Sequence, residues 1–152
     1  MEKESFVNIL NNSSKNNINN KYNNYFEHLS NNIENIPNIL FYGPPGVGKY
    51  SESLKFINKY SPSNLKYEKK LFINSIKNDH FIKISDIHYE INIENLTCNP
   101  KILFNDIYKN ILDCIESSNT KAGILLLKNF HFINNELLDI IYSYMQKIIN
   151  NN

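Results

Sequence analysis

The pattern of apolar and polar positions predicts helices and strands that alternate along the chain. Apolar residues at helical spacing predict helices over residues 6–10, 22–36, 50–60, 100–115 and 134–148. Continuous or alternating apolar runs predict strands over residues 39–42, 87–93 and 122–127, with a hairpin around Asn78 and Asp79. Strands that alternate with helices are typical of an α/β protein with a layered, mainly parallel sheet.

Polar residues and prolines mark where these elements begin and end. Pro37 is expected to end the second helix, Pro100 to begin the fourth, and Asn134 to cap the last one. In the strand after the hairpin, apolar residues alternate with Glu90 and Glu94. Because successive side chains of a strand point to opposite faces, we expect both glutamates on a solvated face.

A glycine-rich stretch connects the first predicted strand to the helix that follows it. Its residues are Gly43, Pro44, Pro45, Gly46, Val47, Gly48 and Lys49, followed by Tyr50 and Ser51. The spacing G-x-x-x-x-G-K is that of a P-loop, in which glycines let backbone N–H groups surround a phosphate and the lysine reaches the outer phosphates. The sequence therefore predicts a P-loop NTPase fold in which these nine residues bind ATP or ADP.

Several positions depart from what Mg²⁺-dependent hydrolysis needs. The residue after the P-loop lysine is Tyr50 instead of the Ser or Thr whose hydroxyl binds Mg²⁺, and Ser51 supplies a hydroxyl one residue late. The run over 122–127 is the expected Walker B strand, but Lys128 and Asn129 stand where a metal-binding Asp and a catalytic Glu are needed. We therefore expect no catalytic residue, no metal site, and Mg²⁺ weakly bound or absent. The Lys128 ammonium can instead neutralise a phosphate directly.

Other residues with chemical potential are isolated. Asp86 ends a strand and is the one alternative metal ligand, although an Asp in a turn is ordinary. His80 and His88 have no cluster of ligands around them in the sequence and are typical of surface or structural histidines. Cys98 and Cys114 lack metal spacing, which favours a reduced, intracellular protein.

Composition limits the function classes further. The 152 residues suit one domain, the net charge of +1 does not favour direct binding to DNA, and all 16 basic residues are lysine. No apolar run reaches the roughly 18 residues that would cross a membrane. Asparagine makes up about one residue in five, and a polar tract predicts a flexible Asn-rich segment over 1–21 ahead of a core over 22–150.

The order of motifs resembles the small subunits of the AAA+ clamp loaders, the replication factor C family. The resemblance lies in NILFYGPPGVGK at 38–49, SDIHYEINIEN at 85–95 and ILLLKNFHFINNELLDIIYSYMQ at 124–146. It implies an AAA+-like three-layer sandwich with a β-hairpin insertion, degenerate and truncated, without the lid and collar of that family. The composition, rich in residues with AT-rich codons, suits a large DNA virus or a protist.

The resemblance implies a clamp-loader-like subunit in DNA replication that binds nucleotide without hydrolysing it. Its expected partners are other clamp-loader-like subunits or a sliding clamp, with DNA contacted only indirectly and no membrane. The expected location is the nucleus or a viral replication site, otherwise the cytoplasm. Two alternatives stay open: an active small P-loop ATPase or nucleotide kinase that uses Asp86, and a protein-interaction module that binds no nucleotide.

Overall fold

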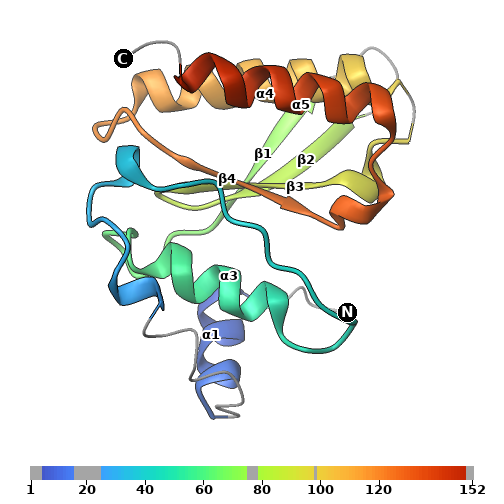
Figure 1. Ribbon diagram of the computed structural model, residues 1–152. Helices are drawn as coiled ribbons and strands as arrows, with labels where there is room; N and C mark the ends of the chain where they lie inside the picture. Colours follow the sequence, from blue (N-terminus) through green and yellow to red (C-terminus); the bar gives the residue numbers. More distant parts are fainter. Residues whose placement is uncertain (1–4, 16–24, 75–78, 98, 150–152) are drawn as a thin grey trace.

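The chain forms three layers, with a β-sheet between two pairs of helices. A computed structural model describes residues 5–15, 25–74, 79–97 and 99–149. Figure 1 shows α4 (Pro100–Ser117) and α5 (Asn135–Ile149) on one face of the sheet and α1 (Phe6–Lys15) and α3 (Lys49–Asn58) on the other. The α/β class and the layered arrangement expected from the alternating pattern are therefore confirmed.

The sheet has four strands in the order of the sequence. They are β1 (Lys69–Asn74), β2 (Asp79–Ile84), β3 (His88–Asn92) and β4 (Ile124–Lys128). The first three pair antiparallel, which confirms the hairpin, whose turn residues 75–78 lie outside the described part. β4 pairs with β3 in parallel after the crossover through α4. The expectation of a mainly parallel sheet is wrong, because the hairpin and its continuation supply three of the four strands as a meander.

Local sequence signals explain where the helices begin. Pro100 is the first residue of α4, where its missing N–H costs nothing. The Asn134 side chain accepts a hydrogen bond from the Leu137 N–H at 2.9 Å and caps α5 as predicted. α1 includes the expected apolar turn and continues to Lys15, into the polar tract, and its Phe6 side chain is fully buried. The flexibility expected for residues 1–21 stays a prediction.

Two apolar clusters hold the layers together. One joins the sheet to α4 and α5 through Ile91, Phe104, Ile107 and Leu137, all nearly inaccessible to solvent. The other lies under α3 and contains Phe6, Leu54, Ile57 and Leu65. β4 contributes to both, since Leu125 and Leu127 pack against the first cluster and Ile124 and Leu126 against the second. The most hydrophobic run of the chain is thus covered on both faces, as expected for a strand between helical layers.

The helix predicted over 22–36 is wrong for its described part. Residues 25–27 form a helical turn, and Ile33–Asn35 form a 3-10 helix. Between them, the Ser30 hydroxyl accepts from the Asn32 N–H at 3.0 Å, and the Asn32 side chain accepts from the Glu34 N–H at 3.1 Å. Such local bonds compete with the hydrogen bonds of a helix, although the apolar spacing is helical.

The strand predicted over 39–42 is also wrong as an element of the sheet. Residues 37–44 are irregular, and no backbone hydrogen bond joins residues 38–42 to the rest of the described chain. The side chains nevertheless alternate as in a strand: Ile39 and Phe41 pack against the α3 cluster, whereas Leu40 and Tyr42 are exposed. The segment has the pattern of a strand and lacks a neighbour to pair with.

Candidate functional site

The glycine-rich stretch leads directly into the first turn of α3. Gly46 and Gly48 have φ angles of +82° and +81°, which side chains other than glycine rarely adopt. Gly48 is the residue that precedes the helix, and its carbonyl accepts from the Glu52 N–H at 2.9 Å. The loop therefore presents the N-terminal end of a ten-residue helix, where exposed N–H groups favour an anion.

The Lys49 side chain lies back across this loop. Its Nζ donates to the carbonyl oxygens of Gly43 and Pro44, both at 2.7 Å. The ammonium therefore lies against the loop backbone, and its role in binding phosphate stays a prediction. A phosphate bound in the loop would compete with these two carbonyls for the Lys49 ammonium.

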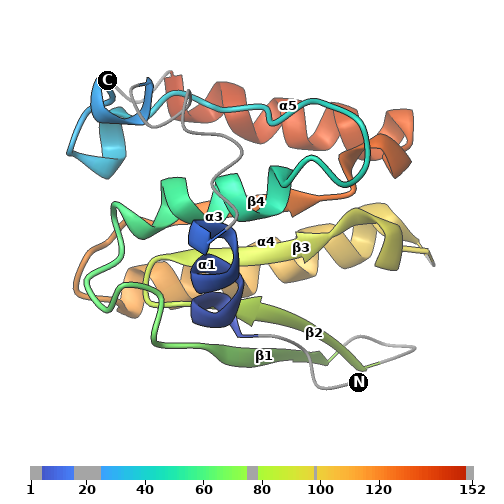
Figure 2. The same cartoon turned by 90° about the horizontal axis from the view of Figure 1, so that it is seen from below.

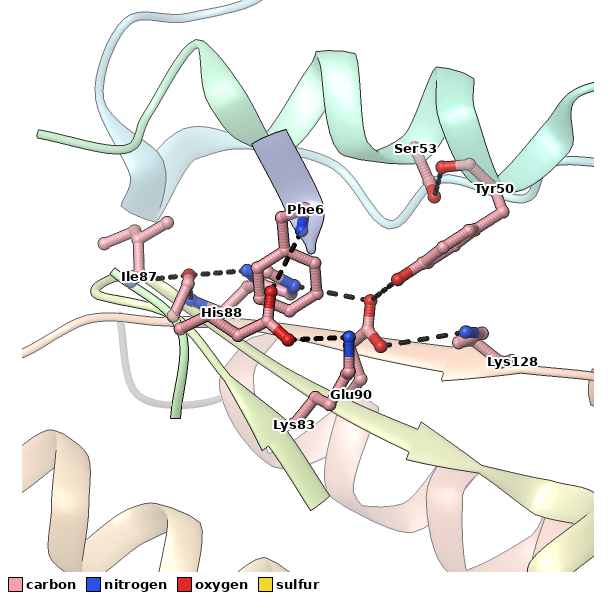
Figure 3. A network of polar contacts seen from close by, with 10 residues as sticks. Phe6, Tyr50, Ser53, Lys83, Ile87, His88, Glu90 and Lys128 are labelled. Atoms are coloured by element: carbon pink, nitrogen blue, oxygen red, sulfur yellow. Dashed lines mark hydrogen bonds and ion pairs between the residues drawn. The ribbon is translucent and has the colours of Figure 1, made fainter. Parts of the chain in front are cut away.

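Tyr50 and Lys128, the two substituted motif positions, contact each other. The Lys128 Nζ lies 3.7 Å from the centroid of the Tyr50 ring, a close cation–π contact. Figure 3 shows that both side chains converge on Glu90 of β3. The Tyr50 hydroxyl donates to Glu90 Oε1 at 2.6 Å, and Lys128 Nζ lies 3.7 Å from Glu90 Oε2. The first turn of α3 is thus tied to the middle of β3 and to the last residue of β4.

His88 completes this cluster from the same strand. Its side chain is fully buried, and its Nε2 lies 3.6 Å from Glu90 Oε1, an electrostatic contact longer than a hydrogen bond. The Ser85 hydroxyl lies 2.5 Å from His88 Nδ1 and accepts from the N–H groups of Ile87 and His88. Since its oxygen already accepts two hydrogen bonds, the hydroxyl donates to Nδ1, which leaves the ring proton on Nε2 facing Glu90.

The cluster keeps Glu90 ionised although the side chain is 4% exposed. Burial by itself raises the pKa of the Glu90 carboxyl, but the contacts from His88, Lys128 and Tyr50 outweigh it and hold the pKa below its ordinary value. Burial, followed by the charge of Glu90, raises the pKa of the Tyr50 phenol well above its usual range. At neutral pH the cluster therefore holds a carboxylate, an ammonium and a neutral phenol.

The sequence alone did not indicate that Glu90 belongs to the site. The expectation that it lies in solvent is wrong, because α1 and α3 cover the face of the sheet to which it points (Figure 2). Alternation assigned Glu90 correctly to the face opposite Tyr89 and Ile91, but it does not tell what covers that face. No pattern in the sequence indicated that Tyr50 and Lys128, 78 positions apart, would share Glu90 as an acceptor.

These residues do not fit a magnesium ion. Mg²⁺ prefers oxygen ligands in an octahedral arrangement, whereas Lys128 brings a positive charge against the Glu90 carboxylate. Asn129, at the second Walker B position, donates its amide to Asn92 Oδ1 at 3.0 Å and Glu94 Oε2 at 3.2 Å. Among the described residues, no group of three or more His, Cys, Asp and Glu is arranged to hold a metal.

Asp86, the alternative metal ligand, lies at the other end of α3. Its carboxylate accepts from the Ser61 hydroxyl and the Ser63 N–H, each at 2.8 Å. Both serines follow the C-terminal end of a helix that is about 15 Å long, while Lys49 begins it. Asp86 therefore has a structural role in this turn, and the hypothesis that it binds Mg²⁺ at the loop loses its geometric basis.

Replacing Asp86 with alanine should lower the free energy of unfolding by about 1 kcal/mol, because two hydrogen bonds to a carboxylate are lost. Burial raises the pKa of Asp86, but the bonds from Ser63 and Ser61 lower it below the ordinary 3.8. The stabilisation is therefore present above pH 3.8 and disappears as the pH falls through the native pKa. Urea denaturation at several pH values measures this, with the exposed Asp113→Ala as control; equal stability of the two variants at neutral pH contradicts the assignment.

The remaining candidate residues lie on separate elements where the structure describes them. Ser51 lies in α3 one residue beyond Tyr50, and its use as a substitute hydroxyl stays a prediction. His88 is structural, as expected, and His80 lies half-buried in β2. Cys114 is a half-buried free thiol, and Cys98 lies outside the described residues. Within the described chain, no helix is long and apolar enough to span a membrane.

Comparison with known proteins found similarity over one short stretch of the chain. No protein-family model matches the chain. A curated protein named Replication factor C subunit 4, from Caenorhabditis elegans, is 42% identical over 40 residues. The match covers 26% of this chain and 12% of that protein. A stretch of this length suggests a relation to clamp-loader subunits and is too short to establish membership of the family.

Proposed function

We propose that this chain is a clamp-loader-like subunit that binds the phosphates of ATP or ADP without Mg²⁺ and does not hydrolyse the nucleotide. The observation that carries the proposal is the Lys128 ammonium, held between the Tyr50 ring and Glu90 beside the glycine-rich loop. This ammonium stands at the first Walker B position and contacts the ring of Tyr50 in the first turn of α3, where the P-loop interpretation expects phosphate to bind. It supplies charge without the open coordination positions that a metal offers.

The loop supplies the other half of the proposed site. The helix N-terminus and the Lys49 ammonium both favour an anion, and glycine at positions 46 and 48 allows the positive φ angles of the loop there. No residue is assigned as a general base: Asn129 is an amide, and Asp86 lies at the far end of α3. The function proposed is therefore structural support that depends on nucleotide.

The proposed partners follow from the short similarity to the clamp-loader subunit. We place the chain in DNA replication, beside other clamp-loader-like subunits or a sliding clamp, with DNA contacted only through them. The nucleus or a viral replication site is the proposed location. The AAA+-like P-loop NTPase fold belongs to the same proposal, supported by the glycine-rich loop before α3 and the parallel pair of β3 and β4.

Thermal unfolding with ATP or ADP tests nucleotide binding. At a tenfold excess over the dissociation constant, a ligand that binds only the folded chain stabilises it by about 1.4 kcal/mol. We expect this shift for the wild type and for Lys101→Ala, an exposed control in α4, and its loss in Lys49→Ala. ATP turnover should stay at background in all three. Measurable turnover by the wild type contradicts the proposal.

A second candidate function has one specific observation in its favour. Lys49 donates to the carbonyls of Gly43 and Pro44, so the loop itself supplies hydrogen-bond acceptors for this ammonium. In a protein-interaction module that binds no nucleotide, Lys49 would keep these two hydrogen bonds when ATP or ADP is added. The absence of any nucleotide shift in the wild type would support this candidate against the proposal.

A further inference from the structure

The N-terminal turn of α3 precedes the part of this helix that apolar packing holds. The first N–H groups of a helix have no carbonyl partner within it, and the first bond of α3 runs from the Glu52 N–H to the Gly48 carbonyl at 2.9 Å. Leu54 is the first apolar residue of the helix that is fully buried. We therefore expect the turn over 49–52, which carries the proposed phosphate site, to open more easily than the middle of the helix.

The Tyr50 hydroxyl ties this turn to the sheet. In Figure 3 the Tyr50 side chain reaches from α3 to Glu90, and its hydroxyl donates to Glu90 Oε1 at 2.6 Å. A hydrogen bond to a carboxylate is stronger than one between neutral groups. Glu90 is 5% exposed and lies in β3, which pairs with β2 on one side and β4 on the other. The hydroxyl thus fixes the turn to a strand that is itself held from both sides.

The position of Tyr50 also affects Lys49, the residue before it. Side chains of successive helix residues point about 100° apart. The Lys49 side chain lies back across the loop, with its Nζ 2.7 Å from the carbonyl oxygens of Gly43 and Pro44, while the Tyr50 side chain reaches the sheet. Holding the Tyr50 hydroxyl on Glu90 therefore sets the direction from which Lys49 enters the loop.

We infer that Tyr50 is a positioning residue: its hydrogen bond to Glu90 holds the first turn of α3, with its N–H groups and Lys49, in the orientation that binds phosphate. The inference rests on the proposed function. Tyr50 does not touch the phosphate; it restricts the orientations of the unbound turn, so that less order has to be gained on binding. At the position where a Ser or Thr hydroxyl would bind Mg²⁺, the chain has a hydroxyl that binds its own carboxylate.

Titration of ATP in the presence of a chelator tests the inference on the full chain. Tyr50→Phe keeps the ring that contacts Lys128 and removes only the hydroxyl. We expect the dissociation constant to rise about tenfold, because the unbound turn then samples more orientations. Glu90→Ala, which removes the acceptor, should raise it by a similar factor. Glu90→Gln, whose amide oxygen still accepts from Tyr50, should raise it less than about threefold.

A matched control separates positioning from general stability. Asp86→Ala removes hydrogen bonds at the opposite end of α3 and should destabilise the fold without changing the affinity for ATP. All variants are titrated at a temperature at which each is folded. If Tyr50→Phe binds ATP like the wild type, or if Asp86→Ala weakens binding as much, the inference is overturned and the proposed function stands. If the wild type binds no ATP, both are overturned.

Amide hydrogen exchange without ligand gives a second readout. The Glu52 amide should exchange about tenfold faster in Tyr50→Phe than in the wild type, because amides at a helix end exchange through local opening. Asp86→Ala should leave this rate unchanged. Equal exchange in the wild type and Tyr50→Phe overturns the inference even where ATP binding differs, since the hydroxyl then does not hold the turn.

Discussion

Replacing Glu90 with alanine should lower the free energy of unfolding by about 3 kcal/mol, since an acceptor is removed from a buried polar cluster. The Tyr50 hydroxyl loses a hydrogen bond of 2.6 Å, and the Lys128 ammonium and His88 Nε2 lose their nearby negative charge. These groups then stay buried or half-buried without compensation. Urea denaturation at pH 7 measures the effect. Glu34→Ala, which removes an exposed glutamate, should change stability by less than about 0.5 kcal/mol.

Glu90→Gln separates the charge from the hydrogen bond. The amide oxygen still accepts from Tyr50, so the loss should be smaller than for alanine. Because the native pKa of Glu90 is lowered, its charge stabilises the fold above the ordinary carboxyl pKa of 4.5, and this contribution disappears as the pH falls through the native pKa. The difference between wild type and Glu90→Gln should therefore shrink at acid pH. A difference that is constant with pH, or a loss in Glu90→Ala below 1 kcal/mol, contradicts the ionised cluster.

Replacing Lys128 with aspartate should cost about 2 kcal/mol, because a carboxylate then faces Glu90 and the cation–π contact with Tyr50 is lost. Millimolar Mg²⁺ should recover part of this loss, since two neighbouring carboxylates offer oxygen ligands to a cation. The wild type should not respond to Mg²⁺. Thermal unfolding with Mg²⁺ or with a chelator measures both effects.

Two control variants separate local charge from other causes. Lys128→Met keeps the length of the side chain and should lose less stability than Lys128→Asp, because it adds no repulsion. Lys101→Asp, at an exposed position of α4, reports the effect of the same charge change far from the cluster. If Lys128→Asp is as stable as Lys101→Asp, the Lys128 ammonium does not have the role assigned to it.

The sequence predicted the elements with strong local signals and missed those that depend on neighbours. Pro100 and Asn134 begin α4 and α5 as expected because each signal lies within one turn of the helix. The run over 39–42 has the alternation of a strand, but pairing needs a second strand, which no local pattern reports. The helix over 22–36 failed because Ser30 and Asn32 bond to the backbone of residues nearby.

For the candidate site, the sequence indicated the glycine-rich turn before α3 and did not indicate the charge network. Gly46 and Gly48 have positive φ angles, a local property of glycine, whereas phosphate binding by this loop stays a prediction. Tyr50 and Lys128 were interpreted as two separate losses, since 78 positions separate them in the sequence. Only the pairing of β3 with β4 and the position of α3 bring them together on Glu90.

Isothermal titration of ATP into the wild-type chain, once with excess Mg²⁺ and once with a chelator, tests the central claim most directly. Because an ammonium at Lys128 stands where a metal-binding carboxylate is needed, we predict the same dissociation constant within about twofold in both buffers, and no binding to Lys49→Ala. Binding that is tenfold or more tighter with Mg²⁺ would contradict the metal-independent site. Undetectable binding in both buffers would contradict the phosphate site itself.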